Sequence, residues 1–398
     1  MVMNNHFPED LLLQILVWLP VISLSRFKCV CKSWYAFISD QTFIYEHLLH
    51  TQSPSNRNKN TLFLVNQRDK ITSKHVVSTL SYETLQVSLA QVPLPSPYSG
   101  IIDKKVEIFI VGSCNGLVCL HDNCGLNTLL WNPATKETKV VPVSNLPGLP
   151  ANYSASPNGI GFGFDAKTHN YKIIRNFLFF ENYPNLDVYE MALVDEYQMG
   201  VMFYSEVYSL RTDSWTQVDN QLPFCIWNAF GGMKTNLNGI GNWWASDSDW
   251  EGIVSFDVAK EVFLITPMPN DSLIYNGYRY DVEYFLLNEL VAVAISWKKR
   301  HAEWSPMCWD VWLLNEYGVR ESWTKLFRVG PLTGICRPLE FWRNDIIFFE
   351  KDGQLALYDV STKEMMSTIN LQIDGDQVFS FQVISYMESL VSISGLIN

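Results

Sequence analysis

The stretch FPEDLLLQILVWLPVISLSRFKCVCKSWYAFI, residues 7–38, predicts two or three short and very apolar helices at the start of the chain. Pro8 suits the first turn of a helix, where a missing N–H costs nothing. Four apolar residues then follow the helical spacing i, i+3, i+4 and i+7, and these are Leu12, Ile15, Leu16 and Leu19. Pro20 ends this helix, Ser23 caps a second one, and Trp34 lies in a third.

These helices hold too many large apolar side chains for so small a bundle to bury alone. Small domains leave much of their surface exposed, and a further turn around Phe43, Leu48 and Leu49 adds three more apolar residues. Exposed apolar patches of this kind mark a site for a partner. The alternative interpretation is a helical cap that packs on the main domain.

The composition indicates a folded chain with more than one structural unit. Its 398 residues exceed the size at which a single core usually keeps growing, and 47% are hydrophobic while only 18% are charged. The formal net charge of -12 argues against a nucleic-acid binder, because Lys and Arg supply the affinity for phosphate backbones. If charge guides a partner, that partner is basic.

The eight cysteines are scattered along a chain whose first residues do not resemble a secretory signal peptide. We therefore expect free thiols in a reducing compartment, the cytoplasm or also the nucleus. No run approaches the roughly 18 consecutive apolar residues of a membrane span. Cys114, Cys119 and Cys124 have the spacing C-x4-C-x4-C, but no histidine cluster completes a zinc site, so we expect buried thiols.

The rest of the chain repeats a strand, a polar turn and a second strand. The repeated units are LLWNPATKETKVV, GFGFDAKTHNYKII, EVYSLRTDSWTQV, IVSFDVAKEVFLI, DVWLLNEYGVRESWTKL and LALYDVSTKEMMSTI. Their turns lie roughly 30 to 60 residues apart, a spacing typical of propeller blades. After a polar linker at 51–60, we therefore predict an all-β domain at 61–395, a β-propeller of about six blades. A two-sheet β-sandwich is the alternative, because one sequence does not show whether a ring closes.

The helical stretch resembles an F-box, and the run RFKCVCKSW at 26–34 carries this similarity most specifically. The resemblance places a three-helix F-box at residues 4–50. It implies docking to an Skp-type adaptor, which connects the protein to a cullin and a RING protein in a ubiquitin ligase. The positions that match the adaptor-binding motif are Pro8, Leu12, Ile15, Leu16, Leu19, Pro20, Leu24, Val30, Cys31, Lys32 and Trp34. Two residues depart from the family pattern, since Phe7 replaces a leucine and Trp18 stands where the family often has arginine.

The strand-rich region is similar to the plant F-box-associated, kelch-related domain in the runs NPATKE, GFGFD, VYSLRTDSW and SWTKLFRVGP. Within that family, ESWTKLFRVGPLTGICRPLEFW is closest to the S-locus F-box proteins of pollen. The resemblance implies a substrate-recognition subunit of an SCF ligase that directs its target to ubiquitination and proteasomal degradation. For the S-locus group this target is the basic S-RNase of the pistil. A receptor for another target, such as a defence or signalling regulator, is the alternative.

An acidic segment without Lys or Arg lies between Arg175 and Arg211. Complementary charge steers partners together and rejects wrong ones. We predict that this segment contacts a basic target through Glu181, Asp187, Glu190, Asp195 and Glu196. The alternative is a solvated loop without a partner.

Motifs for catalysis are weak along the whole chain. The run GIGFGF lacks the spacing of a nucleotide-binding loop, and the seven histidines show no zinc spacing. We therefore expect a non-catalytic receptor without a cofactor or metal and without contact to nucleic acid or membrane. The other class considered is a propeller enzyme or lectin with a helical cap, in which NWWASDSDW would stack on sugars.

Overall fold

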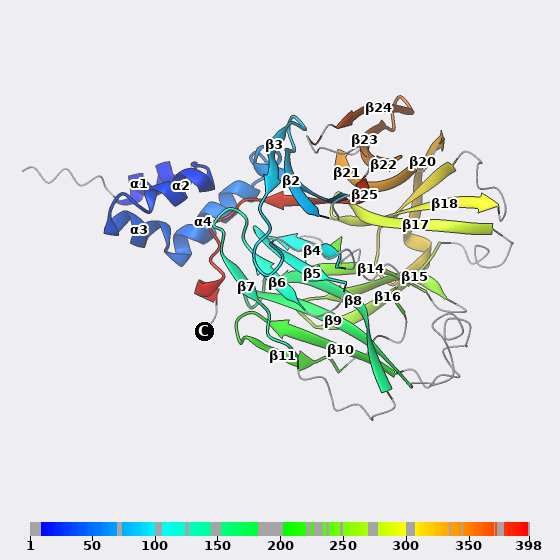
Figure 1. The fold of residues 1–398 in the computed structure, drawn as a ribbon, viewed down its shortest axis with the longest axis horizontal. Coiled ribbons are helices and arrows are strands. Elements are labelled where there is room, and N and C mark those ends of the chain that lie inside the picture. The colour runs from blue at the N-terminus through cyan, green and yellow to red at the C-terminus, as the bar shows by residue number, and fades with distance from the viewer. Residues whose placement is uncertain are drawn as a thin grey trace, which may run out of the picture.

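A computed structural model gives the fold of the chain. Figure 1 shows a group of short helices on one side and a ring of twisted sheets on the other. The structure describes residues 9–69, 74–99, 106–123, 127–144, 153–181, 202–219, 222, 225–226, 234–235, 239–246, 250–269, 278–299, 307–333, 336–343, 345–369, 371 and 378–396.

Five α-helices begin the described part of the chain. They are α1 (Glu9–Leu16), α2 (Val21–Phe27), α3 (Lys32–Ile38), α4 (Gln41–Gln52) and α5 (Arg57–Asn60). Because α2 starts directly after Pro20, Ser23 lies inside this helix and the predicted cap at Ser23 is wrong. α4 has 12 residues where the sequence predicted one further turn. Its N-terminus is capped by Asp40, whose Oδ1 accepts hydrogen bonds from the N–H groups of Thr42 (2.9 Å) and Phe43 (3.4 Å). α5 makes the predicted linker partly helical.

The apolar stripe predicted for α1 is divided between two sides of the helix. Leu16 is buried, and Leu12 packs against the same core. Ile15 belongs to the predicted stripe but is 53% exposed. Leu11 and Trp18 are 46% and 68% exposed on the same outer side, at i−4 and i+3 from Ile15. The first helix and the turn after it therefore carry apolar side chains both on the face that packs into the core and on the face exposed to solvent.

The described strands form six antiparallel sheets, which we number as blades around the ring. Blade 1 contains β25 (Val378–Met387), β1 (Thr61–Asp69), β2 (His75–Ser81) and β3 (Val87–Val92). Blade 2 contains β4 (Ile108–Cys114), β5 (Leu117–Asp122), β6 (Thr128–Trp131) and β7 (Thr138–Val140). Blade 3 contains β8 (Tyr153–Asp165), β9 (Asn170–Glu181), β10 (Met202–Ser209) and β11 (Ser214–Gln217).

Blades 4 to 6 follow the same order of strands. In blade 4 the short strands β12 (Cys225–Ile226) and β13 (Lys234–Thr235) both pair with β14 (Ile240–Ser246), which is followed by β15 (Glu251–Asp257) and β16 (Val262–Pro267). Blade 5 contains β17 (Tyr278–Leu287), β18 (Leu290–Lys299), β19 (Met307–Leu314) and β20 (Trp323–Leu332). Blade 6 contains β21 (Cys336–Arg343), β22 (Ile346–Lys351), β23 (Gln354–Asp359) and β24 (Glu364–Ile369).

The two ends of the β domain close the ring. β25, from the C-terminal end, pairs antiparallel with β1, and Leu64 lies opposite Ile384. Inner strands of neighbouring blades touch in a complete circuit, which runs through β25, β4, β8, β14, β17, β21 and back to β25. The prediction of short N-terminal helices followed by a six-bladed propeller is confirmed, and the closed circuit excludes the two-sheet sandwich.

A side-chain oxygen organises the polar turn that recurs in the sequence. In blade 2, Oδ1 of Asn132 accepts hydrogen bonds from the N–H groups of Ala134 (3.0 Å) and Thr135 (3.2 Å). The same pair of bonds is made in blades 3, 4 and 6 by Asp165, Asp257 and Asp359. Four residues after each acceptor the backbone is left-handed, with φ between 52° and 64°, at Lys136, His169, Glu261 and Lys363. Asn and Asp favour such turns because their side chains replace a backbone acceptor.

Apolar clusters fill the contacts between neighbouring blades. Leu64 and Trp131 lie in the cluster between blades 1 and 2, and Phe285 and Phe349 lie in the cluster between blades 5 and 6. The cluster between blades 2 and 3 differs, because it continues into the helices. Its members from the helices include Leu16, Leu24, Ile38, Phe43 and Leu48.

Residues 388–396, which we call the C-terminal strap, join the helices to the propeller. Leu390 and Ile393 are buried in the apolar cluster that also holds the helices. Nδ2 of Asn132 donates to the carbonyl oxygens of Ser389 (3.1 Å) and Val391 (2.8 Å). At the other end of the strap, Gln41 of α4 donates to the carbonyl oxygen of Gly395 (3.3 Å). Figure 1 shows this segment in red beside α4.

The helices also contact several turns of the propeller directly. The contacts are a hydrogen bond from Gln52 to Asn115 (2.8 Å), an ion pair between Arg57 and Glu289 (2.5 Å) and a ring contact between Tyr45 and His169 (5.8 Å between centroids). All three partners lie in turns between the first and second strands of their blades. The opposite strand ends, such as Glu181 and Met202, therefore lie on the side of the ring away from the helices (Figure 1).

Candidate functional site

Exposed apolar side chains are concentrated on the helices. Eight of the sixteen large hydrophobic side chains that are exposed in the described part of the chain lie between residues 11 and 49. They are Leu11, Ile15, Trp18, Ile22, Val30, Tyr35, Tyr45 and Leu49. The other eight are distributed over the much longer propeller. The helices therefore present the main apolar surface of the described molecule.

The predicted adaptor-binding residues divide into three groups by burial. Ile15, Pro20, Val30, Cys31 and Lys32 are exposed. Leu12, Leu19 and Trp34 are half-buried, and Leu16 and Leu24 are buried. Pro8 lies outside the described residues. In the free chain the exposed group is open to a partner, while the buried pair holds the helices together.

Leu11, Trp18 and Ile22 are exposed apolar residues that the motif comparison did not select. Helical spacing alone did not find them, because apolar residues follow one another almost without interruption from Leu11 to Leu19. Such a segment has no polar side that identifies the solvent face. The sequence signal for this exposed face is the spacing of Leu11, Ile15, Trp18 and Ile22, whose steps of four, three and four residues match one side of a helix.

Trp18 is held in place by a ring from α4. Its indole lies 4.2 Å from the His50 ring, measured between centroids, in an edge-to-face arrangement. Nδ2 of Asn56 lies 3.2 Å from Nε2 of His50, and since an amide nitrogen only donates, Nε2 is the acceptor of this contact. Nδ1 of His50 is buried without a hydrogen-bond partner.

An exposed thiol lies at the start of α3. Cys31 is the residue before α3, and its Sγ lies 3.1 Å from Oγ of Ser33. The Ser33 hydroxyl, followed by the Trp34 N–H, lowers the pKa of the exposed Cys31 thiol. On either side of Val30, Arg26 and Lys32 are exposed.

Charge is divided unevenly between the two parts of the chain. Residues 1–60 carry five Lys or Arg and four Asp or Glu, which gives a net charge of +1. Residues 61–398 carry the remaining 24 Lys or Arg and 37 Asp or Glu, which gives -13. The helices and the propeller therefore suit partners of different charge.

The predicted acidic segment is described only at its edges. Glu181 ends β9, and Asp187, Glu190, Asp195 and Glu196 lie outside the described residues. Glu206, which lies on β10 near the end of the segment, is buried and pairs with Arg175 at 2.6 Å. The carboxylate of Glu206 is therefore paired inside blade 3 and is not available to a partner.

A pocket of about 280 Å³ lies at the outer edge of blades 2 and 3, between Ser144, Tyr204 and Trp215. Its two carboxylates are both engaged. Glu206 accepts a hydrogen bond from Ser144 (2.5 Å) as well as pairing with Arg175, and Asp213 accepts from Tyr208 (2.6 Å). The pocket thus presents satisfied polar groups and no unpaired carboxylate.

The cysteines Cys114 and Cys119 pack in the apolar cluster between blades 2 and 3. Burial raises the pKa of the Cys114 thiol to about 12 and that of Cys119 further. Cys124 lies outside the described residues. Among the residues that the structure describes, no group of three or more His, Cys, Asp or Glu is placed to hold a metal ion. In the same part of the chain, no helix has the length and apolar character needed to cross a membrane.

The structure thus combines an apolar helical surface with a closed six-bladed ring. Residues 5–45 match the F-box domain, and residues 59–393 match the F-box associated beta propeller domain. The chain therefore belongs to the plant F-box proteins that carry an F-box-associated β-propeller. Its more specific similarity to the S-locus group stays a prediction.

Similar proteins share this organisation along most of their length. An F-box/kelch-repeat protein of Arabidopsis thaliana is 27% identical over 379 residues, which cover 93% of this chain and 92% of the relative. A putative F-box protein of the same plant is 24% identical over 420 residues, covering 100% of this chain and 97% of the relative. Among solved structures, a chain of a nidogen/laminin complex aligns with 83% of this chain and 99% of its own, at 11% identity and a TM-score of 0.42. That similarity is too distant to bear on function.

Proposed function

We propose that the chain is the substrate-recognition subunit of an SCF-type ubiquitin ligase. The helices bind an Skp-type adaptor, which connects the chain to a cullin and a RING protein. The propeller binds a protein target and holds it near the ubiquitin donor, so that transfer depends on proximity and not on catalysis by this chain. The observation that supports this function is the concentration of exposed apolar side chains on the F-box helices.

Burial of the exposed apolar side chains of the helices by a partner would contribute favourable binding free energy. Each Å² of apolar surface removed from water contributes about 25 cal/mol. Ile15 and Val30 are more than half exposed, and both match the adaptor-binding motif. The neighbouring Arg26 and Lys32 add positive charge at the border of this surface. An apolar partner surface bordered by acidic groups is therefore the best complement.

Co-purification with a recombinant Skp-type adaptor tests this function. Ile15→Glu combined with Val30→Glu should abolish capture, because two charges would be buried in an apolar interface. Both residues are exposed in the free chain, so the thermal unfolding midpoint should stay close to that of the original protein. Leu264→Glu, on the outer strand β16, is the matched control and should bind normally. Failure of the unmodified chain to bind adaptor, or normal binding by the double variant, would refute the proposal.

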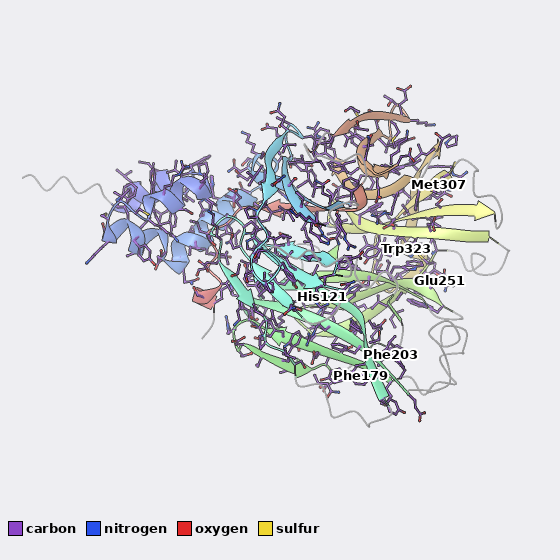
Figure 2. The ribbon with its side chains drawn as sticks, in the orientation of Figure 1. His121, Phe179, Phe203, Glu251, Met307 and Trp323 are labelled. Carbon is purple, nitrogen blue, oxygen red and sulfur yellow. The ribbon has the colours of Figure 1, made fainter. Side chains whose placement is uncertain are left out.

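The target is expected on the side of the propeller away from the helices. This side lies opposite the turns that contact the helices, and it includes the end of β9 at Glu181 and the beginning of β10 at Met202. Phe203 and Tyr204 are half-buried at this end of the blade, and Tyr204 stacks on the buried Phe179 at 5.5 Å between centroids. Figure 2 shows Phe179 and Phe203 at this end of blade 3. Aromatic side chains are enriched in protein interfaces, which supports a protein target.

Charge supports a basic target at the same place. The segment between Arg175 and Arg211 contains no Lys or Arg, and the propeller region as a whole has a net charge of -13. Basic secreted ribonucleases of the pistil are one class of target with suitable charge, in agreement with the resemblance to the S-locus group. A basic regulator of another pathway has the same chemistry.

Charge reversal distinguishes a charge-guided target from other targets. Glu190, Asp195 and Glu196 are changed together to Lys, and capture of a basic pistil ribonuclease is measured at low and high salt. Weaker capture and a smaller salt dependence are expected, because the opposite charges that steer encounter are lost. Glu83 and Glu364, which are exposed on the helix side of the propeller, are reversed to Lys as a control and should leave capture unchanged. Capture that is equal in both variants would remove the acidic segment from the target site.

A further inference from the structure

We propose that β11, the outer strand of blade 3, binds an uncharged extended peptide of a partner protein as an added antiparallel strand. One apolar side chain of this peptide fills the pocket that lies beside β11. The inference deepens the proposed function, and it rests on that function only in assigning the peptide to the ligase target. Proteins that add a strand in this way gain affinity from main-chain hydrogen bonds and selectivity from pockets for alternate side chains.

The outer side of β11 is an open sheet edge. β11 ends the sheet of blade 3, and no described strand pairs with its other side (Figure 1). On the inner side, the N–H of Val218 donates to the carbonyl oxygen of Ser205 on β10. Because bonding alternates along an antiparallel pair, Thr216 also bonds to β10, whereas the backbone groups of Trp215 and Gln217 point outward. β11 therefore offers two N–H and two carbonyl groups at the spacing of an extended chain.

The edge of β11 lacks the residues that protect sheet edges from pairing. The outer strand of blade 5, β20, carries the exposed charges of Lys325 and Arg328, which hinder the approach of another strand. β11 has the sequence SWTQ, with neither a charge nor a proline. The outer strand of blade 1, β3, is also uncharged. The pocket beside β11 is the second observation, and it points to a ligand at this edge.

The pocket runs along the whole of β11. All four residues of the strand line it, and Pro142, Val143 and Ser144 form the opposite wall of this cavity of about 280 Å³. Nε1 of Trp215 donates to the carbonyl oxygen of Pro142 (2.8 Å), which joins the two walls. Val143 is 82% exposed and gives the pocket an apolar rim. A strand added to β11 would therefore lie along the mouth of the pocket.

The geometry of a sheet decides which peptide side chains reach the pocket. Gln217 pairs with Glu206 across the ladder, so both side chains lie on the same face of blade 3, as does that of Trp215 two residues away. Directly opposite residues of an antiparallel pair share a face. The peptide residues opposite Trp215 and Gln217 therefore point to the pocket, and these are also the residues whose N–H and carbonyl groups bond to β11.

The two carboxylates that line the pocket are paired within the chain. Glu206 is buried and pairs with Arg175 at 2.6 Å, and Asp213 pairs with Lys139 at 2.9 Å. An acidic peptide side chain would meet two carboxylates, and a basic one would find both already neutralised. An uncharged apolar side chain is therefore the best complement to the pocket.

A second copy of this chain suits the edge less well. If two copies paired through β11, each would have to place Trp215 or Gln217 in the pocket of the other. The Trp215 indole is already bound to Pro142, and the guanidinium carbon of Arg175 lies 3.9 Å from the centroid of its ring. A strand of four residues is also short for the roughly 800 Å² that each partner buries in a stable interface.

Binding of a short peptide to the full chain tests the proposal. The probe is an amidated pentapeptide with fluorescein at its N-terminus, in which leucine at the second and fourth positions alternates with threonine. Saturable binding in fluorescence anisotropy is expected, together with slower hydrogen exchange of residues 214–217. N-methylation of both leucine amides should weaken binding roughly 30-fold, the factor for two lost backbone hydrogen bonds. N-methylation of the threonine amides is the matched control and should have little effect, because these amides point away from β11.

Two variants of the chain locate the site. Gln217→Pro removes an outward N–H and leaves the ladder to β10 intact, so binding should weaken about fivefold. Val143→Asp places a carboxylate on the pocket wall and should weaken binding more than about tenfold. Leu89→Asp, on the uncharged outer strand β3, is the matched control and should bind like the original chain. Gln217, Val143 and Leu89 are all exposed, and thermal unfolding checks that each variant is folded.

The outcomes separate this inference from the proposed function. If the chain captures the adaptor but shows no saturable peptide binding up to about 1 mM, the function stands and the peptide site is refuted. If the chain binds the peptide but not the adaptor, the peptide site stands and the function fails. Equal peptide binding by the original chain, Gln217→Pro and Val143→Asp would refute the site. If the peptide does not bind and Gln217→Pro abolishes a concentration-dependent self-association, the edge serves a second copy and the proposal is also refuted.

Discussion

The replacement Asn132→Ala should detach the C-terminal strap from the propeller. Asn132 is fully buried, and its side chain makes four hydrogen bonds. Two are accepted from the N–H groups of its own turn, and two are donated to the carbonyl oxygens of Ser389 and Val391. At a net value of about 1 kcal/mol for each bond, the loss is about 4 kcal/mol.

A matched turn separates the contribution of the strap from that of the turn. Oδ1 of Asp359 accepts the same two turn bonds, at 2.7 Å and 3.1 Å. Asp359→Ala should therefore cost about 2 kcal/mol, and the difference of about 2 kcal/mol from Asn132→Ala belongs to the strap. Asn132→Asp keeps the acceptor for the turn but places a carboxylate against two carbonyl oxygens, so it should also release the strap.

Hydrogen exchange and denaturant unfolding together measure this effect. Amides of residues 388–396 and of α4 should exchange faster in Asn132→Ala and Asn132→Asp, because the strap connects α4 to blade 2. In Asp359→Ala the faster exchange should be confined to blade 6. Equal unfolding free energies for Asn132→Ala and Asp359→Ala, with unchanged exchange in the strap, would refute the role assigned to Asn132.

Three further predictions concern the helical core, the buried histidines and the exposed thiol. Leu24→Ala should destabilise the helices by about 2 to 5 kcal/mol, because Leu24 is fully buried, and adaptor capture should fall while circular dichroism of the propeller is retained. Burial lowers the pKa of His75 and His121 to about 4, below the value of about 6.5 in an unfolded chain, so protonation favours unfolding. Stability should therefore fall as the pH decreases from about 6.5 towards 4, by about 1.4 kcal/mol per pH unit for each histidine, and His121→Gln should reduce this slope in urea unfolding; an unchanged slope would contradict it. The lowered pKa of Cys31 should make it react faster with iodoacetamide than Cys29 near pH 7, and Ser33→Ala should slow it, whereas equal rates measured by mass spectrometry would disagree.

The sequence predicted the helices and the number of blades because both leave local signals. Pro20 separates two helices whatever they pack against, and the turn residues Asn132, Asp165, Asp257 and Asp359 bond to their own backbone. Such features depend on neighbours within a few residues. They survive in any tertiary context, so a single sequence reveals them.

Features that depend on distant contacts were not predicted. The inner side of α1 is chosen by the propeller cluster and the strap, so periodicity alone did not separate Leu16 from Ile15. The completion of blade 1 by β25 requires pairing between the two ends of the β domain. The buried pair of Glu206 and Arg175 likewise joins two strands, so the sequence alone does not separate Glu206 from the other acidic residues of its segment.

The candidate site was predicted in the same uneven way. The motif selected Ile15 and Val30, which the structure shows exposed, and also Leu16 and Leu24, which are buried. A motif records residues that hold the helices together as well as residues that are open to a partner. Trp18 was noticed only as a departure from the family, and its support by His50 needed the packing of α4 against the turn after α1.

Hydrogen-exchange footprinting of the full chain with a purified Skp-type adaptor tests the central claim most directly. If the chain is an SCF receptor, adaptor binding should protect amides between residues 11 and 35 strongly, including the segment around Trp18. The propeller strand ends near Glu181 and Met202 should show no change, since they lie away from the helices. Protection of these strand ends without protection of the helices, or no protection at a saturating adaptor concentration, would contradict the account.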